Sequence, residues 1–198
     1  MTLLAPGMSF VDPVFDSQRC FRSIMNTLAR PGHILSLDGL LEAPAPLEPV
    51  AAAVAMTLFD QDTPIWLDQS LAESPAACGW LTFHSGAPIT TNAADAHFAL
   101  VSDPMTLPSF STFSIGSDRY PDRSTTLILQ VDAIDNNGPI LTGPGIAGPA
   151  RLEFEPLPPA FWDEMARNHA LFPRGIDVIL AGPRCLAALP RSTLATNA

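Results

Sequence analysis

The chain has 198 residues, 47% of them hydrophobic and 15% charged, which predicts one domain over residues 1–198 with a hydrophobic core of its own. The formal net charge is −10 at pH 7, and this acidity argues against nucleic acid as the main partner, because phosphate backbones are bound by lysine and arginine. All ten positive side chains are arginines. The absence of lysine excludes Schiff-base chemistry with pyridoxal phosphate, a Walker-type phosphate site and a lysine general base, since each requires an amine.

The first half of the chain predicts three helices separated by short strands. Residues 16–30 form the first helix, with Asp16 as its N-terminal cap. One face of this helix carries four apolar residues at helical spacing, namely Phe21, Ile24, Met25 and Leu28. The other elements expected here, in chain order, are a strand over 34–37 that ends at Asp38-Gly39, a helix over 48–59, a strand over 65–67, a helix over 74–84 closed by Gly86, and a strand over 98–101.

The second half predicts mainly strands. Residues 125–131 are the clearest of them, apolar and rich in β-branched side chains, so this strand is expected in the centre of the sheet. Residues 136–139 predict a turn. The remaining elements are strands over 140–142 and 150–154 on either side of a Gly/Pro loop, a helix over 159–168, and a hairpin of strands 176–181 and 186–189. Helices and strands alternate throughout, which predicts the α/β class with a mixed sheet and flanking helices.

Seven short segments, in order along essentially the whole chain, resemble the PhnH family of carbon–phosphorus lyase subunits. They are Phe21-Arg22 to Leu28 with Pro31-Gly32, Asp62-Thr63-Pro64-Ile65-Trp66-Leu67, Phe83-His84-Ser85-Gly86-Ala87-Pro88, Leu127-Ile128-Leu129-Gln130-Val131, Leu141-Thr142-Gly143-Pro144-Gly145-Ile146, Phe172-Pro173-Arg174-Gly175-Ile176-Asp177 and Pro190-Arg191-Ser192-Thr193. Each segment alone is a weak signal, whereas seven in order are specific.

The resemblance implies a fold akin to the large domain of pyridoxal-phosphate-dependent transferases, without that cofactor. It also implies membership of a multi-subunit core with the PhnG, PhnI and PhnJ proteins. That assembly attaches a phosphonate to the ribose of ATP with loss of adenine, giving ribose 1-phosphonate 5-triphosphate. Later radical steps cleave the carbon–phosphorus bond, with the iron–sulfur cluster on PhnJ. The resemblance assigns no catalytic residue, cofactor or metal ligand to this chain.

The Gly/Pro loop at residues 142–149 is the most suggestive local feature. Gly143 and Gly145 are candidate ligand-binding residues, because successive backbone N–H groups in glycine-rich loops converge on anions. Pro144 and Pro149 each remove one such donor, and neither GxGxxG nor GxxxxGK[ST] is present. The alternative is a tight connection between strands in which glycine supplies a positive φ.

Arg174 and Arg191 are the other candidate ligand-binding residues. Both lie beside strand ends, and the planar guanidinium fork suits a carboxylate or a phosphate. The alternative for each is an ion pair with one of the twenty acidic residues.

Other chemistry-bearing residues give weaker signals. The four histidines form no HxxxH or HxH pair, so no metal ligand is assigned. Asp60 and Asp62 form an acid/base pair, bind a hard cation, or belong to a turn before strand 65–67. The apolar segment 105–115 is either a partner surface or a covered core loop. The three cysteines lack CxxC spacing, which predicts reduced thiols in a cytoplasmic protein.

Two functions from different classes follow. The first is a non-catalytic subunit of the phosphonate-degrading complex, a homodimer when alone, that docks through an exposed sheet or helix face. The second is an enzyme or sensor that binds a nucleotide or phosphonate through the Gly/Pro loop and the arginines. The missing lysine, the lack of histidine pairs and the lack of a nucleophile motif favour the first. No stretch approaches the roughly 20 apolar residues of a membrane-spanning helix, so no membrane partner is expected.

Overall fold

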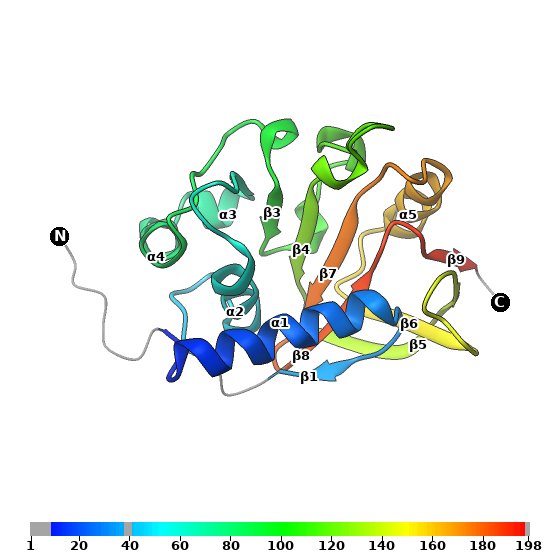
Figure 1. Ribbon diagram of the computed structural model, residues 1–198, viewed down its shortest axis with the longest axis horizontal. Helices are drawn as coiled ribbons and strands as arrows, with labels where there is room; N and C mark the ends of the chain where they lie inside the picture. Colours follow the sequence, from blue (N-terminus) through cyan, green and yellow to red (C-terminus); the bar gives the residue numbers. More distant parts are fainter. Residues whose placement is uncertain (1–8, 38–40, 197–198) are drawn as a thin grey trace.

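The computed structural model describes residues 9–37 and 41–196, and a six-stranded mixed sheet runs through its centre (Figure 1). In spatial order the strands are β1 (Leu35–Ser36), β8 (Cys185–Leu189), β7 (Asp177–Ala181), β4 (Thr126–Gln130), β3 (Phe98–Val101) and β2 (Ile65–Leu67). Strands β2, β3, β4 and β7 are parallel, whereas β8 runs antiparallel to β7, and β1 runs antiparallel to β8. The predicted α/β class with a mixed sheet is confirmed.

Strand β4 lies between β3 and β7, as predicted for the clearest strand of the sequence. Its side chains alternate between the two faces of the sheet. Ile128 belongs to the core cluster on one face, while Leu127 and Leu129 belong to the cluster on the other. Both faces of the strand are therefore covered, which explains why its sequence is almost continuously apolar.

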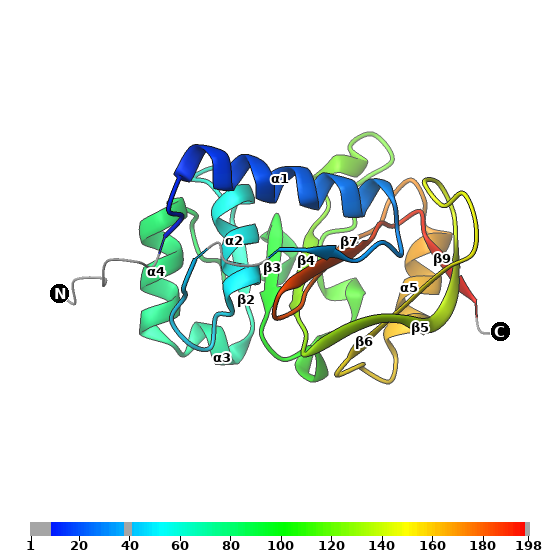
Figure 2. The same ribbon diagram turned by 90° about the horizontal axis from the view of Figure 1, so that it is seen from below.

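Helices cover both faces of the sheet (Figure 2). The helices are α1 (Pro13–Ala29), α2 (Pro49–Leu58), α3 (Gln69–Ala72), α4 (Pro75–Ser85) and α5 (Phe161–Ala170), with 3₁₀ turns η1 (Ala93–Asp95), η2 (Pro104–Thr106), η3 (Phe110–Thr112) and η4 (Pro121–Arg123). Buried residues of α1, α2 and α4 form one core cluster, and buried residues of η3 and α5 belong to the other. None of the helices in the described part of the chain is long and apolar enough to cross a membrane.

A second, three-stranded antiparallel sheet has the order β6 (Ala150–Glu155), β5 (Ala133–Thr142) and β9 (Leu194–Thr196). The turn predicted at residues 136–139 is wrong, because β5 continues through these residues with a register irregularity between Asp135 and Ile140. Asn136 lies in this irregularity and donates from Nδ2 to the carbonyl oxygens of Gly32 and Arg151. A turn-forming sequence is thus held as an irregular strand by tertiary hydrogen bonds.

Helix α1 begins earlier than the sequence indicated. Its cap is Asp12 and not Asp16, since Oδ1 of Asp12 accepts hydrogen bonds from the backbone N–H groups of Val14 and Phe15. Asp16 lies in the first turn, where its Oδ2 accepts from the backbone N–H of Asp12. Pro13 fills the first helical position, which favours this earlier start because proline needs no donor there.

The remaining helices agree with the sequence to within two residues. Gly86 ends α4 in the left-handed conformation at φ 71°, as a helix-terminating glycine does. Helix α5 starts and ends two residues later than predicted. The sequence missed β9 and α3. The predicted end of β1 at Asp38-Gly39 lies outside the described residues.

Candidate functional site

The Gly/Pro loop connects β5 to β6 and contacts the C-terminal end of α1. Gly145 has φ 83°, and a Cβ there would collide with the carbonyl oxygen of Ala29. Gly143 has φ 140°, and its Cβ would lie 2.6 Å from the carbonyl oxygen of Ser192. Both glycines are therefore required by backbone conformation and by close approach, which supports the structural alternative for this loop.

A cavity of about 320 Å³ opens beside this loop. Its lining combines loop residues such as Gly145 and Gly148 with Arg30 and His33 from the end of α1. Neither Arg174 nor Arg191 lines it. The basic residues in this lining are thus Arg30 and His33, which sequence reasoning missed because they precede the loop by more than a hundred residues.

Arg191 is committed to contacts within the chain. Its guanidinium makes two hydrogen bonds with the carboxylate of Asp177, and it also donates to the carbonyl oxygen of Pro121 at 2.7 Å and to the hydroxyl of Ser124 at 2.6 Å. The side chain is largely buried. A guanidinium with this many partners has little capacity left for an anion from solution.

Arg174 is more accessible. Its Nε lies 3.1 Å from Oδ1 of Asp118, close enough for an ion pair but not aligned for a hydrogen bond. The two side chains retain 38% and 86% of their exposure, so solvent screens the pair. Arg191 lies beside the segment that carries Arg174. A Cβ at Gly175 would lie 3.2 Å from Cβ of Arg191, and Nη1 of Arg191 lies 3.5 Å from the carbonyl oxygen of Pro173.

The carboxyl ends of β2, β3, β4 and β7 meet at one edge of the sheet, where parallel α/β proteins commonly bind ligands. A cavity of about 380 Å³ lies at this edge. Three carboxylates line it, from Glu48, Asp103 and Asp132, and no arginine or histidine of the described residues does. The negative charge makes this cavity unsuited to a polyphosphate or a phosphonate.

Asp68 organises the same edge and was missed by sequence reasoning. It follows β2 directly and is buried. Its Oδ1 accepts from the backbone N–H of Leu71 and so caps α3, while its Oδ2 accepts from the backbone N–H and hydroxyl of Ser102 and from the backbone N–H of Asp103. The signal in the sequence that could have identified Asp68 is its position, because polar residues that directly follow parallel strands gather at one edge of the sheet.

Gln130, at the end of β4, likewise hydrogen-bonds to the backbone of another segment at this edge. Its Oε1 accepts from the backbone N–H of Glu48 at 2.8 Å, and its Nε2 donates to the carbonyl oxygen of Pro46 at 2.9 Å. Both ends of the amide are therefore used to attach the start of α2 to the sheet. Asp68 and Gln130 therefore hold this edge of the fold together.

The cysteines, histidines and acidic residues of the described part of the chain have structural roles or stand apart from one another. Within residues 9–37 and 41–196, no three histidine, cysteine, aspartate or glutamate side chains are placed to hold a metal ion. Burial raises the pKa of Cys20 to about 11, which keeps the thiol protonated. Burial also lowers the pKa of His84, whose ring lies 4.5 Å from that of Trp80. The turn interpretation of Asp60 and Asp62 is confirmed, because Oδ1 of Asp60 accepts from the backbone N–H of Asp62.

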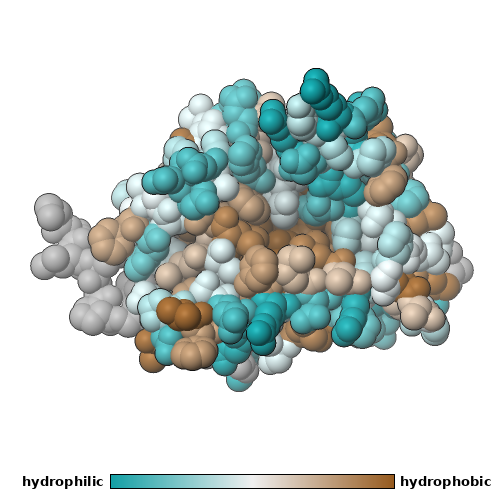
Figure 3. Space-filling model, viewed as in Figure 1, coloured by the Kyte–Doolittle hydropathy of each residue, from teal (hydrophilic) through white to brown (hydrophobic). Residues whose placement is uncertain are grey.

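Helix α1 presents apolar side chains to solvent. The predicted apolar face is only partly buried, since Ile24 packs inward while Phe21 and Met25 are 48% and 49% exposed. Spacings of seven and four residues place Val14, Phe21 and Met25 along one side of the helix. We call these three residues the α1 stripe. In Figure 3, hydrophobic atoms run along the upper edge of α1 and into the hollow above it.

The segment 105–115 behaves differently. Phe110 and Phe113 are buried, which supports the core-loop alternative for most of the segment. Met105 is 53% exposed and stands apart from these two rings. The α1 stripe is therefore the more extended apolar surface on a regular element, and such surfaces mark protein–protein contacts.

Comparison with known proteins gives a consistent result. A family model described as bacterial phosphonate metabolism protein (PhnH) matches residues 8–196. The chain is 42% identical over 186 residues to alpha-D-ribose 1-methylphosphonate 5-triphosphate synthase subunit PhnH of Rhizobium meliloti (strain 1021), which covers 93% of this chain and 92% of the relative. It is 28% identical over 179 residues to HtxG of Stutzerimonas stutzeri, whose name proposes it as a C-P lyase subunit, with 89% and 84% covered.

Proposed function

Because the chain belongs to the PhnH family of bacterial phosphonate metabolism proteins, we propose that it is a non-catalytic subunit of the complex that forms alpha-D-ribose 1-methylphosphonate 5-triphosphate. In this role it supports transfer of a phosphonate to the ribose of ATP, together with PhnG, PhnI and PhnJ. By itself it forms a homodimer. Its free cysteines support a cytoplasmic location.

The observation that carries this proposal is the α1 stripe. Phe21 and Met25 lie on a long, regular helix whose other side packs on α2 and β8, so the exposed side is held rigidly. Aromatic side chains and methionine are enriched at protein interfaces, where burying them contributes most of the binding free energy. We assign both the self-contact of the homodimer and the contact with the other subunits to this stripe.

Two features of the described residues support the non-catalytic role. Arg191 is used internally, and the sheet edge that commonly binds phosphates is lined by carboxylates. The sequence offers no lysine for amine chemistry. We extend the proposal to the fold, as one domain akin to the large domain of pyridoxal-phosphate-dependent transferases without the cofactor. Two core clusters on opposite faces of one sheet support this view.

Native mass spectrometry of the chain alone, and then mixed with PhnG, PhnI and PhnJ, tests the role. We expect a dimer alone and a stable larger complex in the mixture. Met25→Glu is expected to reduce both associations at least tenfold, because it places a charge in the buried centre of the contact. Met105→Glu is the matched control, since Met105 has nearly the same exposure and lies outside the stripe.

The outcomes separate the role from the surface. A wild-type chain that never associates contradicts the subunit role. A complex that survives Met25→Glu but is lost in Met105→Glu contradicts only the choice of surface. A saturable rise in melting temperature with ATP or methylphosphonate, lost in Arg30→Ala and kept in Arg174→Ala, would instead support a nucleotide- or phosphonate-binding protein that uses the Gly/Pro loop.

A further inference from the structure

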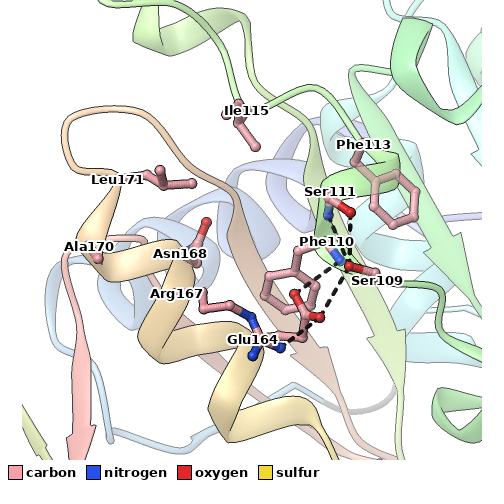
Figure 4. A pocket seen from close by; sticks show the side chains of 10 residues that line it. All are labelled: Ser109, Phe110, Ser111, Phe113, Ile115, Glu164, Arg167, Asn168, Ala170 and Leu171. Carbon is pink, nitrogen blue, oxygen red and sulfur yellow. Dashed lines mark hydrogen bonds and ion pairs between the residues drawn. The ribbon is translucent and has the colours of Figure 1, made fainter.

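A cavity of about 570 Å³ lies between η3 and the C-terminal half of α5 (Figure 4). In the figure, Ile115 and Leu171 stand on one side, Ser111 and Phe113 on the other, and Glu164 closes the lower side. The volume is within the range of about 300–1,000 Å³ that small-molecule sites occupy. Nothing in the proposed subunit role uses this cavity.

The two walls of the cavity are fixed to each other before any ligand arrives. Glu164 of α5 accepts hydrogen bonds from the hydroxyl of Ser109 at 3.1 Å and from the backbone N–H of Phe110 at 3.4 Å. At the far end of α5, the side-chain amide of Asn168 bonds to both the N–H and the carbonyl oxygen of Ile176. The cavity is therefore formed by the fold itself, which lowers the entropic cost of binding.

On the η3 wall of the cavity, the free hydrogen-bonding capacity is that of an acceptor. The hydroxyl of Ser109 donates its single proton to Glu164, and it lies 3.0 Å from the hydroxyl of Ser111. Ser111 must then donate to Ser109, which leaves lone pairs on the Ser111 oxygen to accept a further hydrogen bond. A ligand that suits this wall carries an N–H or O–H donor.

Charge selects against an anionic ligand. The carboxylate of Glu164 lies 2.9 Å from Nη2 of Arg167, so the two charges in the lining compensate each other. The apolar part of the lining comes from Phe110, Phe113, Ile115, Ala170 and Leu171. An anion would lose its hydration here without an unpaired cation in exchange, and the whole chain carries a net charge of −10.

The aromatic walls favour a planar ring. Phe110 already makes an edge-to-face contact with Phe161 at 6.0 Å, and Phe113 makes one with Trp66 at 5.5 Å. A planar ring placed against the small exposed part of Phe110 or Phe113, which are 4% and 3% exposed, would add a further edge-to-face pair. We propose that this cavity binds a small, uncharged aromatic molecule that carries one N–H or O–H donor.

Indole is a suitable probe, and 1-methylindole, which lacks the N–H donor, is its matched partner. We expect isothermal titration calorimetry of the whole chain to give saturable binding of indole with a Kd below about 1 mM. The methyl NMR signals of Ile115 and Leu171 are expected to shift with the same Kd. 1-Methylindole and the anion indole-3-acetate are each expected to bind at least about fivefold more weakly.

Two variants locate the binding. Ala170→Phe fills the cavity from its exposed rim, whereas Ala166→Phe adds the same ring on the same helix at an exposed position outside the lining. We expect the first to abolish indole binding and the second to preserve it. Ser111→Ala is expected to make indole and 1-methylindole bind equally, because it removes the acceptor that distinguishes them.

Three results would overturn the proposal. They are the absence of saturable indole binding to the wild-type chain, binding that persists in Ala170→Phe, and tighter binding of indole-3-acetate than of indole. Loss of association with PhnG, PhnI and PhnJ has no bearing on these titrations, which use the chain alone. Failure of the subunit role and failure of this site are therefore distinguished.

Discussion

The guanidinium of Arg191 contacts the carboxylate of Asp177 at two points, with Nε 3.1 Å from Oδ1 and Nη2 2.6 Å from Oδ2. Through Pro121 and Ser124 the same side chain also reaches the segment that precedes β4. Arg191 itself follows β8. Its contacts therefore join three segments, which are the residues before β4, the start of β7 and the residues after β8.

This network predicts that Arg191→Ala destabilises the protein by about 2–4 kcal/mol, because the buried partners lose their donors. Arg191→Lys is expected to recover little of that loss, since an ammonium cannot reproduce the planar two-point contact. Urea unfolding measures both. Arg174→Ala is the control, as its exposed ion pair with Asp118 is worth at most about 1 kcal/mol. Equal losses for the two alanine variants would contradict the assignment.

The Gly/Pro loop gives a second prediction. Gly145→Ala is expected to destabilise the protein by about 2 kcal/mol or more, because alanine at φ 83° is strained and its Cβ collides with the carbonyl oxygen of Ala29. Gly148→Ala, in the same loop, meets nothing within 4 Å and has no positive φ, so its melting temperature should stay near that of the wild type. A neutral Gly145→Ala would mean that the loop is free to move away from α1.

Asp68 provides a third prediction. Asp68→Asn is expected to cost about 2–3 kcal/mol, since an amide NH₂ in place of one carboxylate oxygen faces N–H donors instead of accepting from them. Asp60→Asn is the control, because Asp60 is exposed and its carboxylate accepts one backbone hydrogen bond within a turn. Chemical denaturation of the two variants separates a buried structural carboxylate from an ordinary turn residue.

Cys20 makes stability depend on alkaline pH. Burial raises its pKa from 9.0 in the unfolded chain to about 11 in the folded protein. Below pH 9 the thiol is protonated in both states, whereas between pH 9 and 11 only the unfolded chain releases its proton, so folding loses about 2–3 kcal/mol over this window. Burial also raises the pKa of the Cys185 thiol, so a variant at Cys20 is needed to isolate the contribution of Cys20.

The measurement is the free energy of unfolding at pH 8, 9, 10 and 11 for the wild type and for Cys20→Ala. We expect the difference in the free energy of unfolding between the wild type and Cys20→Ala to change by about 2–3 kcal/mol between pH 9 and pH 11, with the wild type losing more. Parallel curves would show that the thiol ionises equally well in both states, and hence that it is not buried as described.

Much of the fold follows from local sequence patterns. The apolar, β-branched run of β4 and the stop at Gly86 express backbone and side-chain preferences that act over a few neighbouring residues. The start of α1 at Asp12 is equally local, and was misplaced because both Asp12 and Asp16 are suitable caps. The choice between them depended on Pro13.

The roles of the candidate residues were decided by contacts between distant parts of the chain. Arg191 had the same local sequence signal as Arg174, yet only Arg191 meets Asp177, 14 residues away, and Ser124, 67 residues away, in a buried place. Likewise, the sequence around Asn136 predicts a turn, but in the structure its side-chain amide donates to the carbonyl oxygen of Gly32, 104 residues earlier, and the segment forms a strand.

The α/β class, the family and the absence of amine chemistry follow from residue types and their order along the chain. Contacts between distant segments, by contrast, set which face of α1 is buried, which arginine is committed to internal hydrogen bonds and where a cavity lies. Helical spacing shows that Phe21, Ile24 and Met25 share a side of the helix, but burial depends on which part of that side α2 and β8 cover.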